Sequence, residues 1–210
     1  AQYYGSVQTA DAGLLRLIEI LQETGHWDDT LIIYVSDNGI AFPGAKTNLY
    51  EPGMNLPCVV RDPFAEKSGF VTDAMVIWAD IAPTVLDFAG VEVGEKKCHG
   101  RSFLPVLRDA SSEGYDEIYA SHTFHEITMY YPMRVVRERR YKLLWNIAHG
   151  LEYPFASDLY ASATWQGIVK RGEEYYGKRR VEAYLHRPEF ELYDLESDPH
   201  EVNNLAEDPQ

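Results

Sequence analysis

Two polar residues, Asp37 and Asn38, follow an apolar run of strand length at residues 31–35, after a single serine. In open α/β sheets, ligands bind beyond the carboxyl ends of the strands. A carboxylate and an amide oxygen are hard donors that suit Ca²⁺ or Mg²⁺. Asp-Asn-Gly is also an ordinary turn sequence. The spacing therefore leaves a metal site and a simple turn as alternatives.

A lysine, Lys46, lies in the loop that follows, together with Pro43, Gly44 and Gly53. The lysine ammonium is a compact point charge that can hold an anionic oxygen. If the loop carried it back toward a metal, Lys46 would bind a negatively charged group. The alternative is a solvated surface lysine.

The segment 121–134, which we predict to be a loop, contains His122, His125 and Glu126. A histidine beside a carboxylate can do acid–base chemistry or hold sugar hydroxyls. A polar surface loop is the alternative. Aromatic residues near the C-terminus can stack on sugars but are more typical of core packing; they are Tyr175, Tyr176, Tyr184 and Tyr193.

One basic cluster stands out in an acidic chain. Strand alternation divides its side chains between two faces, which predicts a solvated strand pair, and binding of an acidic polysaccharide is the alternative. The cluster consists of Arg134, Arg137, Arg139, Arg140 and Lys142.

The elements that position these residues follow from hydrophobic spacing. Helical spacing of apolar residues from Val7 to Leu21 predicts a helix that ends before Gly25. The continuous run 31–35 predicts a strand buried on both faces, as in a parallel sheet between helices. We further expect a strand at 57–61, a helix at 80–88 with Pro83 in its first turn, and a connector at 94–114.

Beyond the connector the pattern changes to short strands at 118–121, 133–137, 141–145 and 190–193, with helix and loop at 157–184. This predicts an α/β domain over residues 1–115 and a smaller α+β domain over residues 116–210.

Composition limits the classes of function. The 210 residues carry a net charge of −14, which argues against a general nucleic-acid binder. Apolar residues make up 45%, enough for a core, yet no apolar run approaches the length of a membrane span. Cys58 and Cys98 allow one disulfide or two semi-buried thiols, so the compartment cannot be read from them.

In their order along the chain, several motifs resemble the sulfatase family of the alkaline-phosphatase-like superfamily. Within it, the chain is similar to the sulfamidases (N-sulfoglucosamine sulfohydrolases), through Asn38-Gly39-Ile40, Phe42-Pro43, 47–50, 125–129, 131–134 and 158–166. The family motifs are Gly25 with Asp29-Thr30-Leu31, Ser36-Asp37-Asn38-Gly39, Lys46, Asp80-Ile81-Ala82-Pro83-Thr84, Gly100-Arg101-Ser102 and the tail Glu191-Leu192-Tyr193-Asp194, Asp198-Pro199, Glu201 and Asn204-Leu205.

This resemblance implies part of an alkaline-phosphatase-like sheet flanked by helices, followed by the smaller α+β domain. It implies that Asp37 and Asn38 ligate one Ca²⁺ together with carboxylates from outside the chain. Lys46 would be catalytic and hold a sulfate oxygen, and His125 and Glu126 would bind the substrate sugar. The implied reaction is hydrolysis of N-linked sulfate on glucosamine in heparan-like saccharides.

The partners implied are a sulfated saccharide, with no nucleic acid and no membrane span, and a homodimer is an open alternative to a monomer. The resemblance implies a lysosomal compartment in animals or a periplasmic or extracytoplasmic one in bacteria.

The family nucleophile, a formylglycine, arises from Cys or Ser in the motif Cys/Ser-x-Pro/Ala-x-Arg, and neither Cys58 nor Cys98 begins one. We therefore expect the chain to correspond to the C-terminal half of a sulfatase and to be inactive alone. The alternatives are an O-sulfatase or phosphodiesterase of the same superfamily, or a non-catalytic saccharide-binding module. Asp37, Asn38 and Lys46 together argue against the last, because such a module has no need of a metal clamp.

Overall fold

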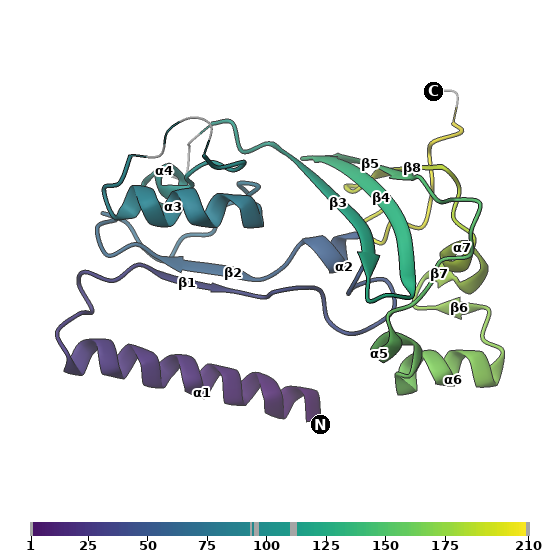
Figure 1. Ribbon diagram of the computed structural model, residues 1–210, viewed down its shortest axis with the longest axis horizontal. Helices are drawn as coiled ribbons and strands as arrows, with labels where there is room; N and C mark the ends of the chain where they lie inside the picture. The colour runs from purple at the N-terminus through teal and green to yellow at the C-terminus, as the bar shows by residue number, and fades with distance from the viewer. Residues whose placement is uncertain (1, 93, 95–96, 110–112, 209–210) are drawn as a thin grey trace. The chain divides into compact units, whose positions relative to one another are not determined.

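A computed structural model describes residues 2–92, 94, 97–109 and 113–208 (Figure 1). The chain divides into two compact units, each treated by itself below. The first unit comprises Ala1–Tyr34 and Val59–Ser112, and the second comprises Val35–Cys58 and Glu113–Gln210. The units differ from the predicted domains in the placement of residues 35–58, and the single domain boundary between residues 115 and 116 stays a prediction.

The first unit opens with helix α1 (Gln2–Glu23), which confirms the helix predicted from apolar spacing. Gly25 follows in the left-handed region with φ 78°, a conformation that glycine adopts without steric cost and that ends the helix. Apolar side chains of this helix remain in contact with solvent, among them Val7 and Leu17, which are 50% and 60% exposed.

Strands β1 (Ile32–Val35) and β2 (Cys58–Arg61) were both predicted, and the structure pairs them in a two-stranded sheet. The expectation that β1 is buried on both faces is wrong for this chain, because its residues are half-buried and Tyr34 is exposed. Among the described residues β1 pairs only with β2, so the neighbours that would bury it are not present.

A 3₁₀ turn, η1 (Trp78–Asp80), leads into α3 (Ile81–Phe88), where Pro83 lies in the first turn as predicted. The Asp80 carboxylate accepts the backbone N–H groups of Ile77 and Arg101 at 2.9 Å each, which holds the turn together. The predicted connector also contains a short helix, α4 (Leu104–Arg108), because Leu104 and Val106 bury their side chains. Residues 95–96 and 110–112 of that connector lie outside the described residues.

The second unit is built on a four-stranded antiparallel sheet in the order β3-β4-β5-β8. Exposed and buried side chains alternate along β5, so one face of the sheet is packed and the other is open. All four strands were predicted, although β3 and β4 extend further at both ends. Their bounds are β3 (Glu117–His125), β4 (Met129–Glu138), β5 (Tyr141–Asn146) and β8 (Phe190–Asp194).

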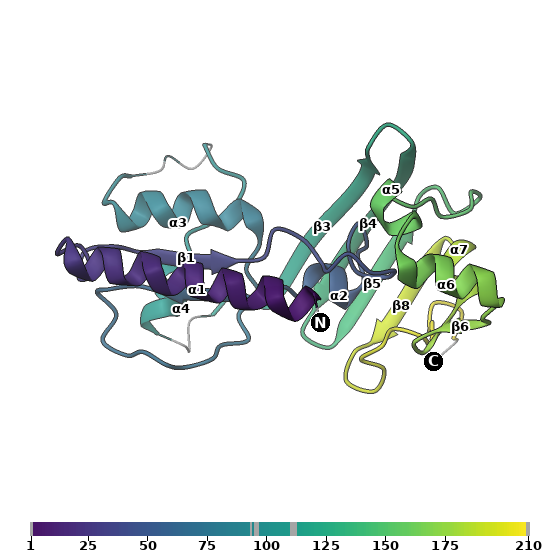
Figure 2. The same cartoon turned by 90° about the horizontal axis from the view of Figure 1, so that it is seen from below.

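Helices lie on the packed side of this sheet in both views (Figure 2). Their core residues Leu159, Trp165 and Tyr184 join the inward residues of the strands in one hydrophobic cluster. Tyr176, Tyr184 and Tyr193 are packing residues, as predicted, whereas Tyr175 is 47% exposed. The remaining elements are α2 (Glu51–Met54), α5 (Ser157–Tyr160), α6 (Ala163–Arg171), β6 (Tyr175–Tyr176), β7 (Arg179–Arg180) and α7 (Val181–Leu185).

Both cysteines are free thiols, so of the two alternatives left by the sequence the structure contains no Cys58–Cys98 disulfide. Across the part of the chain that is described, none of the helices combines the length and apolarity needed to cross a bilayer.

Candidate functional site

The loop of residues 36–50 follows β1 and closes tightly on itself. Ser36 Oγ donates to Asn38 O at 2.8 Å, which shapes the first turn. A Cβ atom on Gly39 would lie 2.9 Å from Gly53 Cα, and one on Gly53 would lie 2.3 Å from Asn48 O. Only glycine therefore fits at these two positions, where the start and the end of the loop touch.

Asp37 and Asn38 are exposed at the start of this loop and suit a partial metal site. Asp37 Oδ1 accepts the Asn38 backbone N–H at 2.9 Å, and Asn38 Nδ2 donates to Gly39 O at 2.8 Å. The second oxygen of Asp37 and Asn38 Oδ1 form no hydrogen bond with any described residue. These two oxygens are hard donors, as Ca²⁺ prefers, but that ion takes about six to eight of them.

No other part of the described chain completes such a site. Within residues 2–92, 94, 97–109 and 113–208 there is no group of three or more His, Cys, Asp or Glu side chains arranged to hold a metal. The ligand role of Asp37 and Asn38 therefore stays a prediction that needs further ligands from outside these residues.

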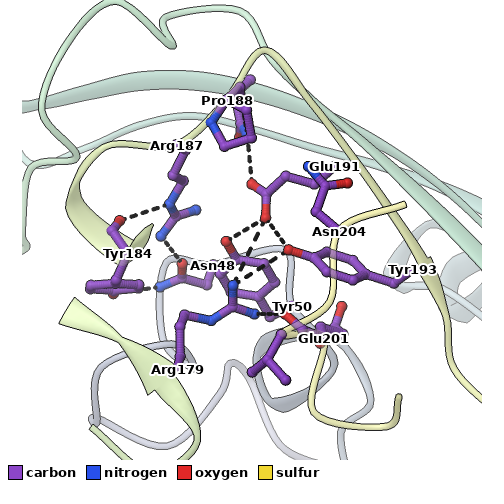
Figure 3. Close-up of polar contacts among 12 residues, drawn as sticks. Asn48, Tyr50, Arg179, Tyr184, Arg187, Pro188, Glu191, Tyr193, Glu201 and Asn204 are labelled. Atoms are coloured by element: carbon purple, nitrogen blue, oxygen red, sulfur yellow. Dashed lines mark hydrogen bonds and ion pairs between the residues drawn. The ribbon is translucent and has the colours of Figure 1, made fainter. Parts of the chain in front are cut away.

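The end of the loop is fixed by contacts with residues far away in the sequence (Figure 3). Tyr184 Oη accepts the Gly44 backbone N–H at 3.1 Å and an Asn48 side-chain N–H at 3.2 Å. Arg187 Nη2 donates to Asn48 Oδ1 at 2.7 Å, and Tyr153 Oη donates to Thr47 O at 2.8 Å. Residues 44–48, which include Lys46, are thus anchored to the C-terminal part of the second unit.

Arg187 is a buried cation, only 2% exposed, at the centre of these anchors. Its guanidinium lies 3.6 Å from the ring centroid of Tyr153 and 4.9 Å from those of Tyr50 and Tyr184. A desolvated cation over an aromatic face gains about 2 kcal/mol or more. Aromatic rings and neutral acceptors therefore stabilise the charge that burial would otherwise penalise.

A second group of contacts fixes the loop where it enters α2. Tyr50 Oη donates to Glu191 Oε2 at 2.8 Å, and the Arg179 guanidinium lies 3.8 Å from the Tyr50 ring centroid. The Glu51 backbone N–H donates to Glu201 Oε2 at 2.6 Å, while Lys142 Nζ lies 2.7 Å from Glu201 Oε1. Figure 3 shows Tyr50, Arg179 and Glu191 of this group pointing toward one another.

Lys46 pairs with a residue that sequence analysis did not single out. Lys46 Nζ donates to Asp158 Oδ2 at 2.5 Å, across 112 positions of the sequence. The Lys46 side chain is 19% exposed and that of Asp158 is 48% exposed. The hydrogen bond from Lys46 lowers the pKa of Asp158, so the carboxylate is ionised at neutral pH.

Glu126 lies in the tight turn between β3 and β4, with φ 58°. The predicted loop at 121–134 is therefore a β-hairpin, because its residues pair as strands up to His125 and Met129. Glu126 Oε1 accepts the Ser157 hydroxyl at 2.9 Å and Oε2 accepts the Ser157 backbone N–H at 3.1 Å. These bonds lower the pKa of Glu126. His125 Nε2 lies 4.0 Å from Glu126 Oε1.

The structure thus brings three predicted site residues together through one unpredicted dipeptide. Ser157 binds Glu126, Asp158 binds Lys46, and His125 lies beside Glu126. Asp158 begins the segment 158–166 that resembles the sulfamidases, but nothing local in the sequence indicates these contacts, because both join segments far apart in the chain. The catalytic role of Lys46 and the substrate-binding roles of His125 and Glu126 stay predictions.

His122, on β3, is a further titratable group. The pairing register shifts between His122 and Phe124, and both His122 and His125 are half-buried although they are three positions apart. Burial lowers the pKa of His122, and the neighbouring charges of His125 and Arg187 act in the same direction. Its Nε2 atom is buried and has no hydrogen-bond partner among the described residues.

The basic cluster of β4 and β5 is largely neutralised by carboxylates. Lys142 is fully buried between Glu51 and Glu201, and Arg137 also pairs with Glu51. Arg139 pairs with Asp116, and Arg140 pairs with Asp194 and Glu196. Arg134 donates to Met133 O. Arg134, Arg139 and Arg140 are exposed, as in a solvated strand pair, whereas Lys142 is buried. Binding of an acidic polysaccharide by this cluster stays a prediction.

Comparison with known proteins gives consistent matches. The profile of a family described as Sulfatase matches residues 1–91. Human N-sulphoglucosamine sulphohydrolase is 37% identical over 222 aligned residues, which cover 100% of this chain and 44% of that protein. An N-acetylglucosamine-6-O-sulfatase of Bacteroides thetaiotaomicron is 32% identical, over 97% of this chain and 31% of that protein. The chain thus spans less than half the length of these relatives.

A solved structure agrees with these matches. It is described as a complex with its substrate, D-glucosamine-2-N,6-O-disulfate, and superimposes with a TM-score of 0.68 at 26% identity, covering 96% of this chain and 35% of that one. A structure described as a 2-O glycosaminoglycan sulfatase superimposes with a TM-score of 0.60 at 22% identity, over 91% of this chain and 35% of that one, and supports the fold alone.

Proposed function

The chain belongs to the sulfatase family, with the alkaline-phosphatase-like fold of that family, and on this premise we propose that it forms part of the active site of a sulfamidase. The enzyme would hydrolyse N-linked sulfate on the glucosamine residues of heparan-like saccharides. The 37% identity with human N-sulphoglucosamine sulphohydrolase over the whole chain supports this substrate class.

The observation that carries the proposal is the convergence of Lys46 with His125 and Glu126 through Ser157-Asp158. A lysine that binds a sulfuryl oxygen and a His-Glu pair that binds a sugar must lie near each other to hold one sulfated sugar. The contacts on either side of Ser157-Asp158 give this arrangement within a single compact unit.

Each residue has a distinct task in this proposal. Lys46 binds a sulfuryl oxygen and stabilises the negative charge that grows there in the transition state. His125 and Glu126 hydrogen-bond to sugar hydroxyls. Asp37 and Asn38 are two of the ligands of a Ca²⁺ ion, which when bound supplies positive charge that offsets the charge of the sulfuryl oxygens. The formylglycine nucleophile and the remaining ligands are expected from outside this chain.

An O-sulfatase of the same superfamily is the second candidate. It is favoured by the 32% identity with an N-acetylglucosamine-6-O-sulfatase and by the likeness to a structure whose substrate carries both 2-N and 6-O sulfates. The substrate class of a sulfated saccharide is common to both candidates. The homodimer, the compartment and the identity of the metal as calcium stay predictions.

Sulfate release by the full-length enzyme tests the proposal. We expect release from N-sulfoglucosamine to be faster than from N-acetylglucosamine 6-sulfate. Lys46→Met should reduce release about 100-fold to 1,000-fold, as removal of a transition-state donor does in other enzymes. The matched control is Lys170→Met at the end of α6, which should leave the rate unchanged. Release from the 6-sulfate alone would replace the sulfamidase with the O-sulfatase.

A further inference from the structure

We propose that Asp158 is a specificity-determining residue that favours an N-linked over an O-linked sulfate at the Lys46 site. This inference rests on the proposed function and deepens it. Asp158 was not a candidate from the sequence, and the contact that singles it out is its 2.5 Å hydrogen bond with Lys46.

The position of Asp158 is fixed on two sides. Its Oδ1 accepts the Leu159 backbone N–H at 2.9 Å and its Oδ2 accepts from Lys46. The preceding residue, Ser157, is held by two hydrogen bonds to Glu126. With 48% of its side chain exposed, Asp158 keeps acceptor capacity toward a ligand that Lys46 and Glu126 bind.

The two kinds of sulfate differ at the atom that bridges sulfur to the sugar. In a sulfamate this atom is a nitrogen that carries a hydrogen and donates a hydrogen bond. In a sulfate ester it is an oxygen, which has lone pairs and no hydrogen. A carboxylate beside the lysine that holds the sulfuryl oxygens therefore attracts the first linkage and repels the second.

The products reinforce this preference. Hydrolysis of a sulfamate breaks the S–N bond and forms an S–O bond with the oxygen of water. Both protons of that water go to the nitrogen, so that R–NH–SO₃⁻ and H₂O give R–NH₃⁺ and SO₄²⁻. The new ammonium is a cation that a carboxylate stabilises. Hydrolysis of an ester yields a neutral alcohol, which gains no such stabilisation from Asp158.

The test compares kcat/KM of the full-length enzyme for N-sulfoglucosamine and for glucosamine 6-sulfate. Asp158→Asn keeps the size of the side chain and removes its charge. We expect the N-to-O ratio of kcat/KM to fall about tenfold to 100-fold, as for loss of one charged hydrogen bond. Asp158→Glu retains the charge and should restore part of the ratio.

The matched control is Asp116→Asn, because Asp116 also pairs with a basic side chain at 2.5 Å in the same unit, but with Arg139 on the basic cluster. Its N-to-O ratio should equal that of the wild type. If Asp158→Asn lowers kcat/KM equally for both substrates, Asp158 only holds Lys46 and the inference is wrong, while the proposed function stands. If the wild type cleaves neither substrate, the proposed function itself fails.

Discussion

Lys46 and Asp37 both carry charge in the loop of residues 36–50, but they are expected to serve different partners. Asp37→Ala removes an anionic metal ligand, so we expect the full-length enzyme to lose both bound calcium and turnover. Lys46→Ala should lower turnover while calcium stays bound, because Lys46 pairs with Asp158 and offers no lone pair to a metal. Metal analysis of the purified variants beside their turnover measures this. Equal calcium loss in the two variants would contradict the division of roles.

Glu126 is proposed to bind the substrate sugar and also forms hydrogen bonds with Ser157, and two substrates can separate these roles. If its carboxylate binds the sugar, Glu126→Ala should damage hydrolysis of N-sulfoglucosamine severely and that of a small aryl sulfate much less, because the aryl sulfate has no sugar hydroxyls. The structure also shows this carboxylate bonded to Ser157 at the first residue of α5. Ser157→Ala is therefore the control, since it loses one of these bonds and keeps Glu126. Equal losses on both substrates in Glu126→Ala would leave only the contact with α5.

In the hydrogen bonds Lys46–Asp158 and Glu126–Ser157, the sequence predicted one partner of each, Lys46 and Glu126. Lys46, His125 and Glu126 stand out through their chemistry and their motifs. Asp158 lies in the segment 158–166 that resembles the sulfamidases, but the contacts of Ser157 and Asp158 were not predicted, because they join residues 31 and 112 positions apart. A sequence motif describes residues that are close together in the chain, whereas these contacts form only when the whole second unit folds.

The loop of residues 36–50 depends on Arg187 for its shape. Arg187→Lys keeps the charge but loses the planar fork that reaches both Asn48 and Tyr184. The buried acceptors left unpaired cost about 1–3 kcal/mol each. We expect a lower free energy of unfolding in urea, together with reduced turnover because Lys46 is no longer held. Arg171→Lys on α6, whose side chain is 63% exposed, should change neither quantity.

Strand β3 contains a group whose titration links stability to pH. Burial holds the pKa of His122 below its usual value of 6.5, so the unfolded chain binds more protons between that value and the lower pKa of the folded state. The contribution of His122 to the free energy of unfolding is therefore fully present above about pH 6.5, and it is lost as the pH falls from there through the folded-state pKa.

We expect His122→Gln to reduce this loss. The measurement is the urea midpoint at pH 7.5 and at pH 5, and the difference should be smaller in the variant than in the wild type. The exposed His200 provides the control, because His200→Gln should leave the difference unchanged. An unchanged difference in His122→Gln would show that other groups carry the pH dependence.

At the scale of elements, the strands were predictable and their surroundings were not. The alternation along β5 and the apolar run at β1 are visible in the local sequence. The sequence predicts a loop at 121–134, where the structure has a hairpin. The pairing register shifts between His122 and Phe124, and this shift interrupts the alternation of buried and exposed residues along β3. The prediction for β1 overestimates its burial. A continuous apolar run is typical of a strand with neighbours on both sides in a complete sheet, whereas among the described residues only β2 pairs with β1.

For the molecule as a whole, we expect the chain to supply only part of a sulfatase site. It spans 44% of human N-sulphoglucosamine sulphohydrolase and contains no Cys/Ser-x-Pro/Ala-x-Arg motif. Asp37 and Asn38 are only two of the metal ligands that the proposed site requires. We therefore expect the 210-residue chain to show no hydrolysis of an aryl sulfate and only weak calcium binding by calorimetry. It should also self-associate in sedimentation experiments, because Val7, Leu17 and Tyr34 expose apolar surface. Measurable turnover, or a stable monomer with a sharp melt, would contradict these expectations.

The contacts that anchor the loop of residues 36–50 also determine when this loop can fold during synthesis on the ribosome. The hydrogen bond from the Gly44 N–H cannot form until Tyr184 is synthesised, 140 residues later. The hydrogen bond from the Glu51 N–H cannot form until Glu201 is synthesised, 150 residues later. At roughly 5–20 residues per second on the ribosome, that delay is about 7–30 seconds. Throughout this interval the nascent segment beside Asp37 and Lys46 is an unanchored chain open to chaperones and proteases. Slow codons between residues 58 and 184 would lengthen the interval and lower the yield of enzyme without changing any amino acid.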